Sequence, residues 1–361
     1  MKVLLVTNDW SPGMGGIQTY LEGLVTRTRH EVRVVAPAHP DARSDRRVVR
    51  HRSRRFLGAS KATASWVAGE AERFGADLVW YGAPHPPALV APAVAQRTGL
   101  PYAVHVHGAE LVVADTLPGV RRRLRRSLRA ATAVWSVSRH TADEVARRAG
   151  REATVLGVGV DAERFHPGDG DDPHGGFVVA CVGRFVPRKG HHRVLRAVAM
   201  LRRDGVEASV LLVGWGRREG ALRRLARRLD VPTRFEVSVG PERLGELYRE
   251  CHAFAMPVED RWFGLEREGL GIVYLEAAAS GLPVVAGYSG GAPETVVPGL
   301  TGFLASRVGD LTGALSWLAA DPARARAMGL AGRAFVVERY GWDAVTERFD
   351  GAVDEAGGVT H

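Results

Sequence analysis

Cysteine is scarce in this chain: only Cys181 and Cys251 occur among 361 residues. Both lie in apolar stretches, and neither has a second cysteine or a histidine at metal-ligand spacing. The sequence therefore gives no sign of a disulfide-stapled scaffold or a zinc site. Two buried, reduced thiols are expected, which is typical of proteins in a reducing compartment.

Long hydrophobic runs are also missing. The longest, such as Val3–Val6 and Phe177–Val182, fall far short of the ~18 apolar residues that span a bilayer. The first residues become polar directly after Val6, too early for the apolar core of a secretory signal. A cytoplasmic protein is therefore expected. The 45% apolar and 25% charged residues exclude disorder, collagen and coiled coil.

Lysine is rare, although the chain is basic. Only Lys2, Lys61 and Lys189 are lysines among 49 basic residues, and the formal net charge is +9. This balance permits anionic partners but does not identify one. A nucleic-acid-binding protein is one alternative, but aromatic residues do not alternate with the basic runs and no nucleic-acid-reading motif is present. No nucleic-acid partner is expected.

Apolar, strand-like runs alternate with amphipathic segments along the chain, which predicts an α/β fold with parallel sheets covered on both faces. The polar stretch at residues 166–176 is rich in Gly, Asp and Pro and predicts a linker. We expect two Rossmann-like domains facing a central cleft, at residues 1–165 and 177–340. The tail, residues 341–361, is expected to form a helix that packs back on the first domain.

The loop after the strand at Phe177–Val182 carries Arg184 and Lys189. In open parallel sheets, ligands bind beyond the carboxyl ends of the strands. A guanidinium and an ammonium that converge there are suited to holding a diphosphate. The alternative is a solvated basic loop.

Two glutamates, Glu268 and Glu276, flank a glycine-rich segment that leads into an Ala-rich helical run. Free backbone N–H groups at a helix start form an anion site. Eight residues of helix span ~12 Å, which places one carboxylate at the sugar end and the other at the ribose end of a nucleotide sugar. A surface helix with two exposed glutamates is the alternative, but it does not explain the glycines.

The first half carries a second glycine-rich loop and two neighbouring histidines. Gly15 and Gly16 link the first strand to a helix and would let backbone approach a ligand closely, unless they form a plain turn. His105 and His107 are two apart on a predicted strand, so they share a face. His107 comes last and is placed to donate a hydrogen bond to a sugar hydroxyl, although such a histidine is often structural.

Together these motifs resemble glycosyltransferase family 4, the retaining enzymes of the GT-B fold. The likeness is greatest to the group of phosphatidylinositol mannosyltransferases and mannoside-mannosyltransferases, and it extends from near residue 1 to about residue 345. The matching pieces are Gly15-Gly16-Ile17-Gln18-Thr19-Tyr20, His107-Gly108-Ala109-Glu110, Ser136-Val137-Ser138, Gly159-Val160-Asp161, Gly183-Arg184-Phe185 with Lys189-Gly190, Glu268-x7-Glu276 and Gly290-Gly291-Ala292-Pro293-Glu294.

The resemblance implies a hexosyltransferase that uses a nucleotide sugar, with GDP-mannose favoured, and a phosphatidylinositol-type acceptor. It implies that His107, Arg184, Lys189 and Glu268 form the catalytic set. Gln18 would touch the acceptor. The implied donor-binding residues are Gly15, Gly16, Arg184, Lys189, Val239, Glu268, Leu270, Gly271, Ile272, Val273 and Glu276.

Within this set, Arg184 and Lys189 would bind the phosphates and stabilise the leaving group. Glu268 would hold the sugar, Glu276 would accept hydrogen bonds from the ribose, and backbone near Val239 would read the base. Two features depart from the family pattern. His252 stands where the family commonly has Asp and is interpreted as structural, and residues 258–267 are longer than in many relatives.

The expected reaction requires no cofactor and no metal, because the cationic loop and the helix-start amides stabilise the leaving phosphate. Asp169-Gly170-Asp171 resembles a metal-binding pair but falls in the predicted linker rather than after a strand. Gly214-Trp215-Gly216-x3-Gly220 mimics a dinucleotide fingerprint, but its last glycine is out of register.

Two arginine clusters remain. Between residues 121 and 129, six arginines surround Val120, Leu124 and Leu128 at four-residue spacing, which predicts a basic amphipathic helix. A less regular patch covers residues 43–55. A helix with a solvated charged face is one interpretation, and reversible docking on an anionic membrane at the inner face of the cell is the other. The candidate membrane residues are Arg121, Arg122, Arg125, Arg126 and Arg129.

Two other hypotheses stay open at this stage. The first is a sugar transferase of antibiotic or other secondary metabolism, with another nucleotide sugar and a soluble acceptor. The second is a catalytically silent protein that binds sugar nucleotides.

Overall fold

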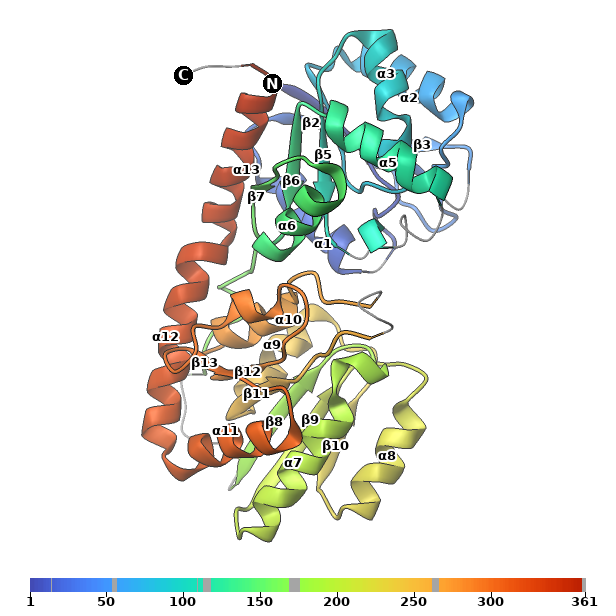
Figure 1. Cartoon of the computed structure of the whole chain (residues 1–361). Helices are drawn as coiled ribbons and strands as arrows, with labels where there is room; N and C mark the ends of the chain where they lie inside the picture. The colour runs from blue at the N-terminus through green and yellow to red at the C-terminus, as the bar shows by residue number, and fades with distance from the viewer. Residues whose placement is uncertain are drawn as a thin grey trace. The chain divides into compact units, whose positions relative to one another are not determined.

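The computed structural model describes residues 1–13, 15–53, 57–108, 110–112, 118–168, 176–261 and 266–358 of the chain. Contacts divide the chain into two compact units. Unit 1 comprises Met1–Gly159 together with Trp342–His361, and unit 2 comprises Val160–Gly341. In Figure 1 the first strands of unit 1 are blue, and its last helix is red.

Unit 1 is built around a seven-stranded sheet of order β3-β2-β1-β4-β5-β6-β7, and every pair in it is parallel. The strands are β1 (Lys2–Val6), β2 (Glu31–Pro37), β3 (Val48–His51), β4 (Leu78–Tyr81), β5 (Tyr102–Val106), β6 (Ala133–Ser136) and β7 (Thr154–Val155). The helices are α1 (Gly16–Arg27), α2 (Lys61–Phe74), η1 (Pro87–Val90), α3 (Ala91–Thr98), α5 (Pro118–Ala130), α6 (Arg139–Ala149) and α13 (Trp342–Ala356).

The two faces of this sheet have separate cores, because side chains alternate along each strand. Leu4 and Tyr81 are buried in one core together with residues of α2, α3 and α5, which Figure 1 shows grouped beside the sheet. On the other face, the rings of Trp80 and Trp135 pack against Phe349 of α13, with centroids 4.8 and 5.5 Å away. Both faces are therefore covered.

Unit 2 has a six-stranded sheet of order β10-β9-β8-β11-β12-β13, again with parallel pairs throughout. The strands are β8 (Phe177–Val182), β9 (Ala208–Val213), β10 (Thr233–Glu236), β11 (Ala253–Met256), β12 (Val284–Ala286) and β13 (Gly302–Leu304). The helices are η2 (Pro187–Lys189), α7 (His191–Arg203), α8 (Glu219–Arg228), α9 (Pro241–Arg249), α10 (Ile272–Ala279), η3 (Ala292–Thr295), α11 (Val308–Ala320) and α12 (Pro322–Tyr340).

The order of strands in both sheets is that of a doubly wound fold, in which the chain reverses direction beside the first strand. The predicted fold class, two Rossmann-like units with parallel sheets, is confirmed. The predicted linker at residues 166–176 falls mainly on residues 169–175, and these, with Asp169 and Asp171, lie outside the described residues. The units divide at Gly159 and again at Gly341.

Candidate functional site

A cluster of three charged side chains lies beyond the carboxyl ends of the strands in unit 2. Lys189, in η2 after β8, donates through Nζ to Oε2 of Glu268 over 2.7 Å. Arg188 donates through Nη1 to the same oxygen over 2.8 Å. Only 10% to 13% of each of the three side chains is exposed. The sequence predicted Lys189 and Glu268 for the site, and the structure brings these two side chains together.

The two cations determine the charge of Glu268. Burial by itself would raise the pKa of this carboxyl, but the charges of Lys189 and Arg188 and their hydrogen bonds together outweigh burial and lower it. Glu268 is therefore an ionised acceptor at neutral pH. Sequence reasoning gave Arg188 no role, and its position beside Lys189 was the only available signal.

Arg184 has a different environment from Lys189. Its side chain is exposed and forms no ion pair with any residue that the structure describes. Its loop is anchored by the buried Phe185, whose backbone N–H donates to the carbonyl of Trp215 over 2.8 Å. The exposed guanidinium is therefore available to an anion from outside the protein.

The helix α10 begins at Ile272, four residues after Glu268, and its N-terminus lies against the Glu268 side chain. Its N-cap is Gly271, which has φ of 89° and no side-chain cap. A Cβ at Gly271 would lie 2.6 Å from the ring of Tyr274 and 3.4 Å from Cγ of Glu268. Glycine is therefore required here. The first N–H groups of the helix have no partner within it, and the helix dipole favours an anion at this end.

Glu276 lies one turn before the end of α10, and its environment contrasts with that of Glu268. Its Oε2 is buried and has no hydrogen-bond partner among the described residues. Burial raises its pKa from 4.5 to about 7, and the charge of Arg164 offsets only part of this effect. A buried acceptor of this kind is suited to a ligand hydroxyl.

The loop after β12 holds the backbone of Glu268. Gly291 donates its N–H to the carbonyl of Glu268 over 3.0 Å, and the Glu268 N–H donates to Oγ of Ser289 over 3.1 Å. Ser289 donates in turn to Asp260 over 2.7 Å. A Cβ at Gly290 would lie 1.8 Å from the Glu268 carbonyl, so only glycine permits this approach. Ser289 and Asp260 were missed from the sequence, because only the folded chain brings them to Glu268.

In unit 1, His107 follows β5 as predicted and stacks on His105, with ring centroids 4.9 Å apart. Its Nε2 lies 2.8 Å from the carbonyl oxygen of Gly82. A carbonyl only accepts, so Nε2 carries the proton. The remaining Nδ1 accepts a hydrogen bond when the ring is neutral and donates only when it is protonated. The backbone N–H of His107 donates to Glu110 over 2.6 Å.

The glycines before α1 serve no packing purpose. Gly15 and Gly16 are exposed, and a Cβ at either position would meet open space. Gly15 is the N-cap of α1 and has no side-chain cap. Gln18, on the first turn, is half-buried and donates through Nε2 to Glu22 over 2.8 Å. The arrangement leaves backbone at this helix start accessible to a ligand.

Other predicted residues lie elsewhere. Val239, whose backbone was expected to read the base, is half-buried in the loop that follows β10, which ends at Glu236. The predicted basic helix is α5, where Leu124 and Leu128 are buried. Arg121, Arg122, Arg126 and Arg129 are exposed there, and Arg125 is half-buried. Arg54 and Arg55 of the second basic patch lie outside the described residues.

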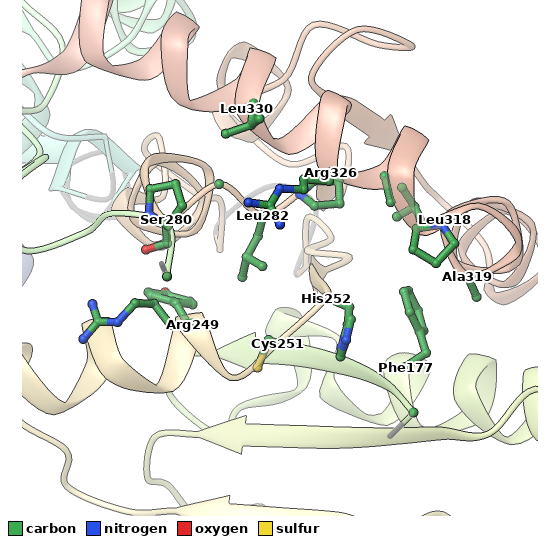
Figure 2. Close-up of a pocket in the computed structure, with 18 of the residues that line it drawn as sticks. Phe177, Arg249, Cys251, His252, Ser280, Leu282, Leu318, Ala319, Arg326 and Leu330 are labelled. Atoms are coloured by element: carbon green, nitrogen blue, oxygen red, sulfur yellow. The ribbon is translucent and has the colours of Figure 1, made fainter. Parts of the chain in front are cut away.

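A separate cavity of about 450 Å³ lies at the opposite, amino-terminal edge of the unit 2 sheet. Figure 2 shows Phe177, His252 and Leu282 around it, and none of the predicted site residues lines it. Nδ1 of His252 accepts a hydrogen bond from the Val178 N–H over 3.0 Å, which ties the start of β11 to β8. This contact supports the structural interpretation of His252.

Comparison with known families and relatives shows the family to which the chain belongs. The model described as Glycosyltransferase Family 4 matches residues 14–164, and the model described as Glycosyl transferases group 1 matches residues 164–335. A Mycolicibacterium smegmatis protein is 41% identical, with 94% of this chain and 95% of the relative covered. The chain belongs to glycosyltransferase family 4. The relative is a GDP-mannose-dependent alpha-(1-6)-phosphatidylinositol monomannoside mannosyltransferase.

Another relative and two solved structures are also similar to this glycosyltransferase. A Corynebacterium glutamicum protein, named a GDP-mannose-dependent monoacylated alpha-(1-6)-phosphatidylinositol monomannoside mannosyltransferase, is 36% identical over 96% of both chains. Among solved structures, Anabaena HepE in complex with UDP matches with a TM-score of 0.82 at 20% identity, covering 98% of this chain and all of HepE. Sucrose-phosphate synthase from Thermosynechococcus elongatus matches with a TM-score of 0.79 at 19% identity, covering 99% and 100%. These structural matches show the fold.

Within the part of the chain that the structure describes, no helix is both long and apolar enough to cross a membrane. Over the same residues, no group of three or more His, Cys, Asp or Glu side chains is arranged to hold a metal ion.

Proposed function

We propose that this glycosyltransferase transfers mannose from GDP-mannose to a phosphatidylinositol-type glycolipid, with retention of the anomeric configuration and without a metal ion. The names of the two actinobacterial relatives support the donor and the acceptor class. The observation that carries the reaction type is the cluster of Lys189, Arg188 and Glu268 beside the N-terminus of α10. This cluster combines two cations, the N–H groups at the start of a helix that are unpartnered within that helix, and one ionised carboxylate.

The donor diphosphate is assigned to three groups: Arg184, Lys189 and the backbone at the start of α10. Arg184 is exposed and unpaired among the described residues, and Lys189 has three N–H donors, so it can serve both Glu268 and a phosphate oxygen. The backbone of the α10 start completes the anion site through Leu270, Gly271, Ile272 and Val273. These groups stabilise the charge that develops on the departing phosphate, and this is the charge a metal ion neutralises in other transferases.

The two glutamates are assigned to the two sugars of the donor. Glu268, ionised and held by two cations, accepts hydrogen bonds from hydroxyls of the transferred mannose. Glu276, whose buried Oε2 lacks a described partner, accepts from the ribose. Backbone near Val239 contacts the base.

Unit 1 supplies the groups assigned to the acceptor and the reacting sugar. By the same proposal, backbone N–H groups at Gly15 and Gly16 are assigned to the donor diphosphate, and Gln18 is assigned to the acceptor. His107 contacts the mannose near the anomeric carbon. Because its Nε2 is committed to Gly82, the contact is made through Nδ1.

Retention follows if the acceptor attacks from the face that the phosphate leaves. The bond between the anomeric carbon and the phosphate oxygen breaks, and the acceptor oxygen bonds to the same face. The acceptor proton passes to an oxygen of the departing GDP. Positive charge at the anomeric carbon and negative charge on GDP therefore remain close together, and this residue set stabilises the negative one.

A panel of nucleotide sugars tests the donor and the acceptor together. The protein is incubated with GDP-mannose, GDP-fucose, UDP-glucose or UDP-N-acetylglucosamine and with a phosphatidylinositol monomannoside, and nucleotide release is measured. We expect release from GDP-mannose that depends on the lipid and persists in EDTA. Faster release from a UDP-sugar, or equal release with a soluble polyol, would support the secondary-metabolite hypothesis instead. NMR of the product reports the anomeric configuration.

The basic face of α5 is proposed to hold the enzyme at an anionic membrane, where its lipid acceptor resides. Arg121, Arg122 and Arg126 are exposed on a helix that contains no acidic residue. Its apolar residues are buried in unit 1, so binding would be electrostatic, at ~1 kcal/mol per basic residue near the surface.

Liposome co-sedimentation tests this docking. The triple variant Arg121→Gln, Arg122→Gln and Arg126→Gln is expected to lose most binding to vesicles that contain phosphatidylinositol. A matched control replaces three exposed arginines of α8, Arg224, Arg227 and Arg228, by glutamine. The docking proposal fails if both triples lose binding equally or if the wild-type protein binds neutral vesicles as well as anionic ones.

A further inference from the structure

Trp215 presents an unusually exposed aromatic ring beside the proposed donor site. Its side chain is 60% exposed, and it makes no ring or cation–π contact with any residue that the structure describes. Single exposed apolar residues are common on protein surfaces, so exposure alone carries no conclusion. The position of Trp215 next to the loop of Arg184 is the observation that supports a role in binding.

The backbone of Trp215 is fixed to the loop that carries Arg184. The carbonyl of Trp215 accepts from the Phe185 N–H over 2.8 Å. Gly214 and Gly216, on either side, have φ of 142° and 150°, and a Cβ on them would lie 2.2 Å from the carbonyl oxygen of Gly183 and 2.9 Å from the Phe185 nitrogen. The Trp215 loop therefore packs backbone to backbone on the Arg184 loop, which no residue larger than glycine would permit.

The order of strands places the Trp215 loop between the loop that carries Arg184 and the loop that carries Val239. Arg184 follows β8, Trp215 follows its neighbour β9, and Val237 to Val239 follow β10, the next strand along. Neighbouring strands are about 4.8 Å apart. Val237 is also exposed, at 42%. Two exposed apolar side chains, Trp215 and Val237, therefore follow the two strands next to the strand that leads to Arg184.

We propose that Trp215 is the stacking platform for the nucleobase of the donor, a positioning and affinity residue for purine nucleoside diphosphates. This inference rests on the proposed function, which puts the diphosphate at Arg184. The base is the planar, weakly polar end of a nucleotide sugar, and it lies a few ångströms beyond the phosphates. An exposed indole on the loop beside that of Arg184 offers the base an aromatic face, while the polar edge of the base stays free for the backbone near Val239.

Any base can stack on an aromatic face, so Trp215 supplies affinity rather than specificity for one purine. Contacts with the polar edge of the base would then select among the purines. A purine covers more of the indole than a pyrimidine does. The contact therefore favours GDP and ADP over UDP by overlap alone.

Calorimetric titration of the full chain tests the platform. Trp215→Ala is expected to weaken GDP binding roughly ten- to hundredfold, to weaken UDP binding less, and to leave binding of inorganic pyrophosphate unchanged. Trp215→Phe is expected to recover most of the GDP affinity. Leu300→Ala, which truncates a side chain that is 59% exposed in the same unit, is the matched control and should not change GDP binding.

A spectroscopic measurement adds an independent readout. A stacked base quenches indole emission, so GDP should quench the wild-type protein more than Trp215→Phe, although the chain has eight tryptophans. Equal GDP affinity in Trp215→Ala and the wild type overturns the platform and leaves the proposed function intact. An equal loss of GDP and pyrophosphate binding also overturns it, because it assigns Trp215 to supporting Arg184. A wild-type protein that binds UDP through Trp215 but not GDP overturns both the purine preference and the proposed donor, and retains only the stacking role.

Discussion

Glu268 and Glu276 lie at the two ends of one loop–helix segment, yet the structure gives them different charge states. Burial acts on both carboxyls in the same direction, raising the pKa. At Glu268 two cations reverse the effect, whereas at Glu276 the more weakly coupled Arg164 offsets it only in part and the pKa is about 7. Partners rather than depth of burial therefore decide which carboxyl is permanently ionised and which titrates near neutral pH.

The difference matches the tasks proposed for the two residues. A carboxylate that holds the sugar during transfer has to be a strong acceptor at every physiological pH, and the cation pair ensures this for Glu268. A carboxyl that contacts the ribose only needs to accept once the nucleotide has arrived. Substitutions can remove the charged partners of Glu268 or the titration of Glu276.

The largest effect is expected from Glu268→Gln, which keeps the shape of the side chain and removes its charge. Lys189 and Arg188 then lose their shared anion, so turnover should fall at least a hundredfold and the free energy of unfolding by about 3 kcal/mol. Nucleotide-release assays and chemical unfolding measure the two losses. Glu219→Gln, which breaks a surface pair with Arg223, is the control and should change neither. Turnover above a tenth of the wild-type rate would remove Glu268 from the catalytic set.

A smaller effect is expected from Arg188→Met, which leaves Glu268 with one cation and makes it more like Glu276. The pKa of Glu268 should rise, so the acid limb of the kcat/KM profile should move to higher pH. The stability that Glu268 contributes is present above its ordinary pKa of 4.5 and is lost as pH falls through the lowered folded pKa. Arg188→Met should therefore also raise the pH of acid unfolding. An unchanged acid limb would show that Lys189 alone sets the charge.

Long apolar runs made most of the fold predictable. The strand at Phe177–Val182 has the predicted bounds, because it consists almost entirely of buried residues. β3 (Val48–His51) was not predicted, because all four of its residues are only half-buried and it lies at the sheet edge within an arginine-rich stretch. Its pairing with β2 comes from the tertiary structure, which local composition does not encode.

The site was predictable where charged residues stand beside glycines in loops. Lys189 was named because it follows a strand within a short loop, and Glu268 was named because glycines and a helix start follow it. The structure joins the two side chains. Ser289 and Asp260, which hold the backbone of Glu268, come from other loops and have no local signature. The charge state of Glu276 was also beyond sequence reasoning, because it depends on how many partners the folded chain brings to each carboxyl.

The smallest effect is the pH dependence assigned to Glu276. If ribose hydroxyls donate to its carboxylate, a pKa of about 7 in the free protein predicts that GDP affinity rises about tenfold between pH 6 and pH 8. Glu276→Gln should bind at the low-pH level throughout. The effect of pH on stability has the opposite sign. Between pH 4.5 and about 7 the folded state holds a proton that the unfolded state releases, so the free energy of unfolding falls as pH rises through that window. Glu276→Gln should lack this fall. Titrations at several pH values and parallel unfolding curves measure both. A GDP affinity that rises equally in Glu276→Gln would assign the titration to another group, and the contrast with Glu268 would then concern structure rather than binding.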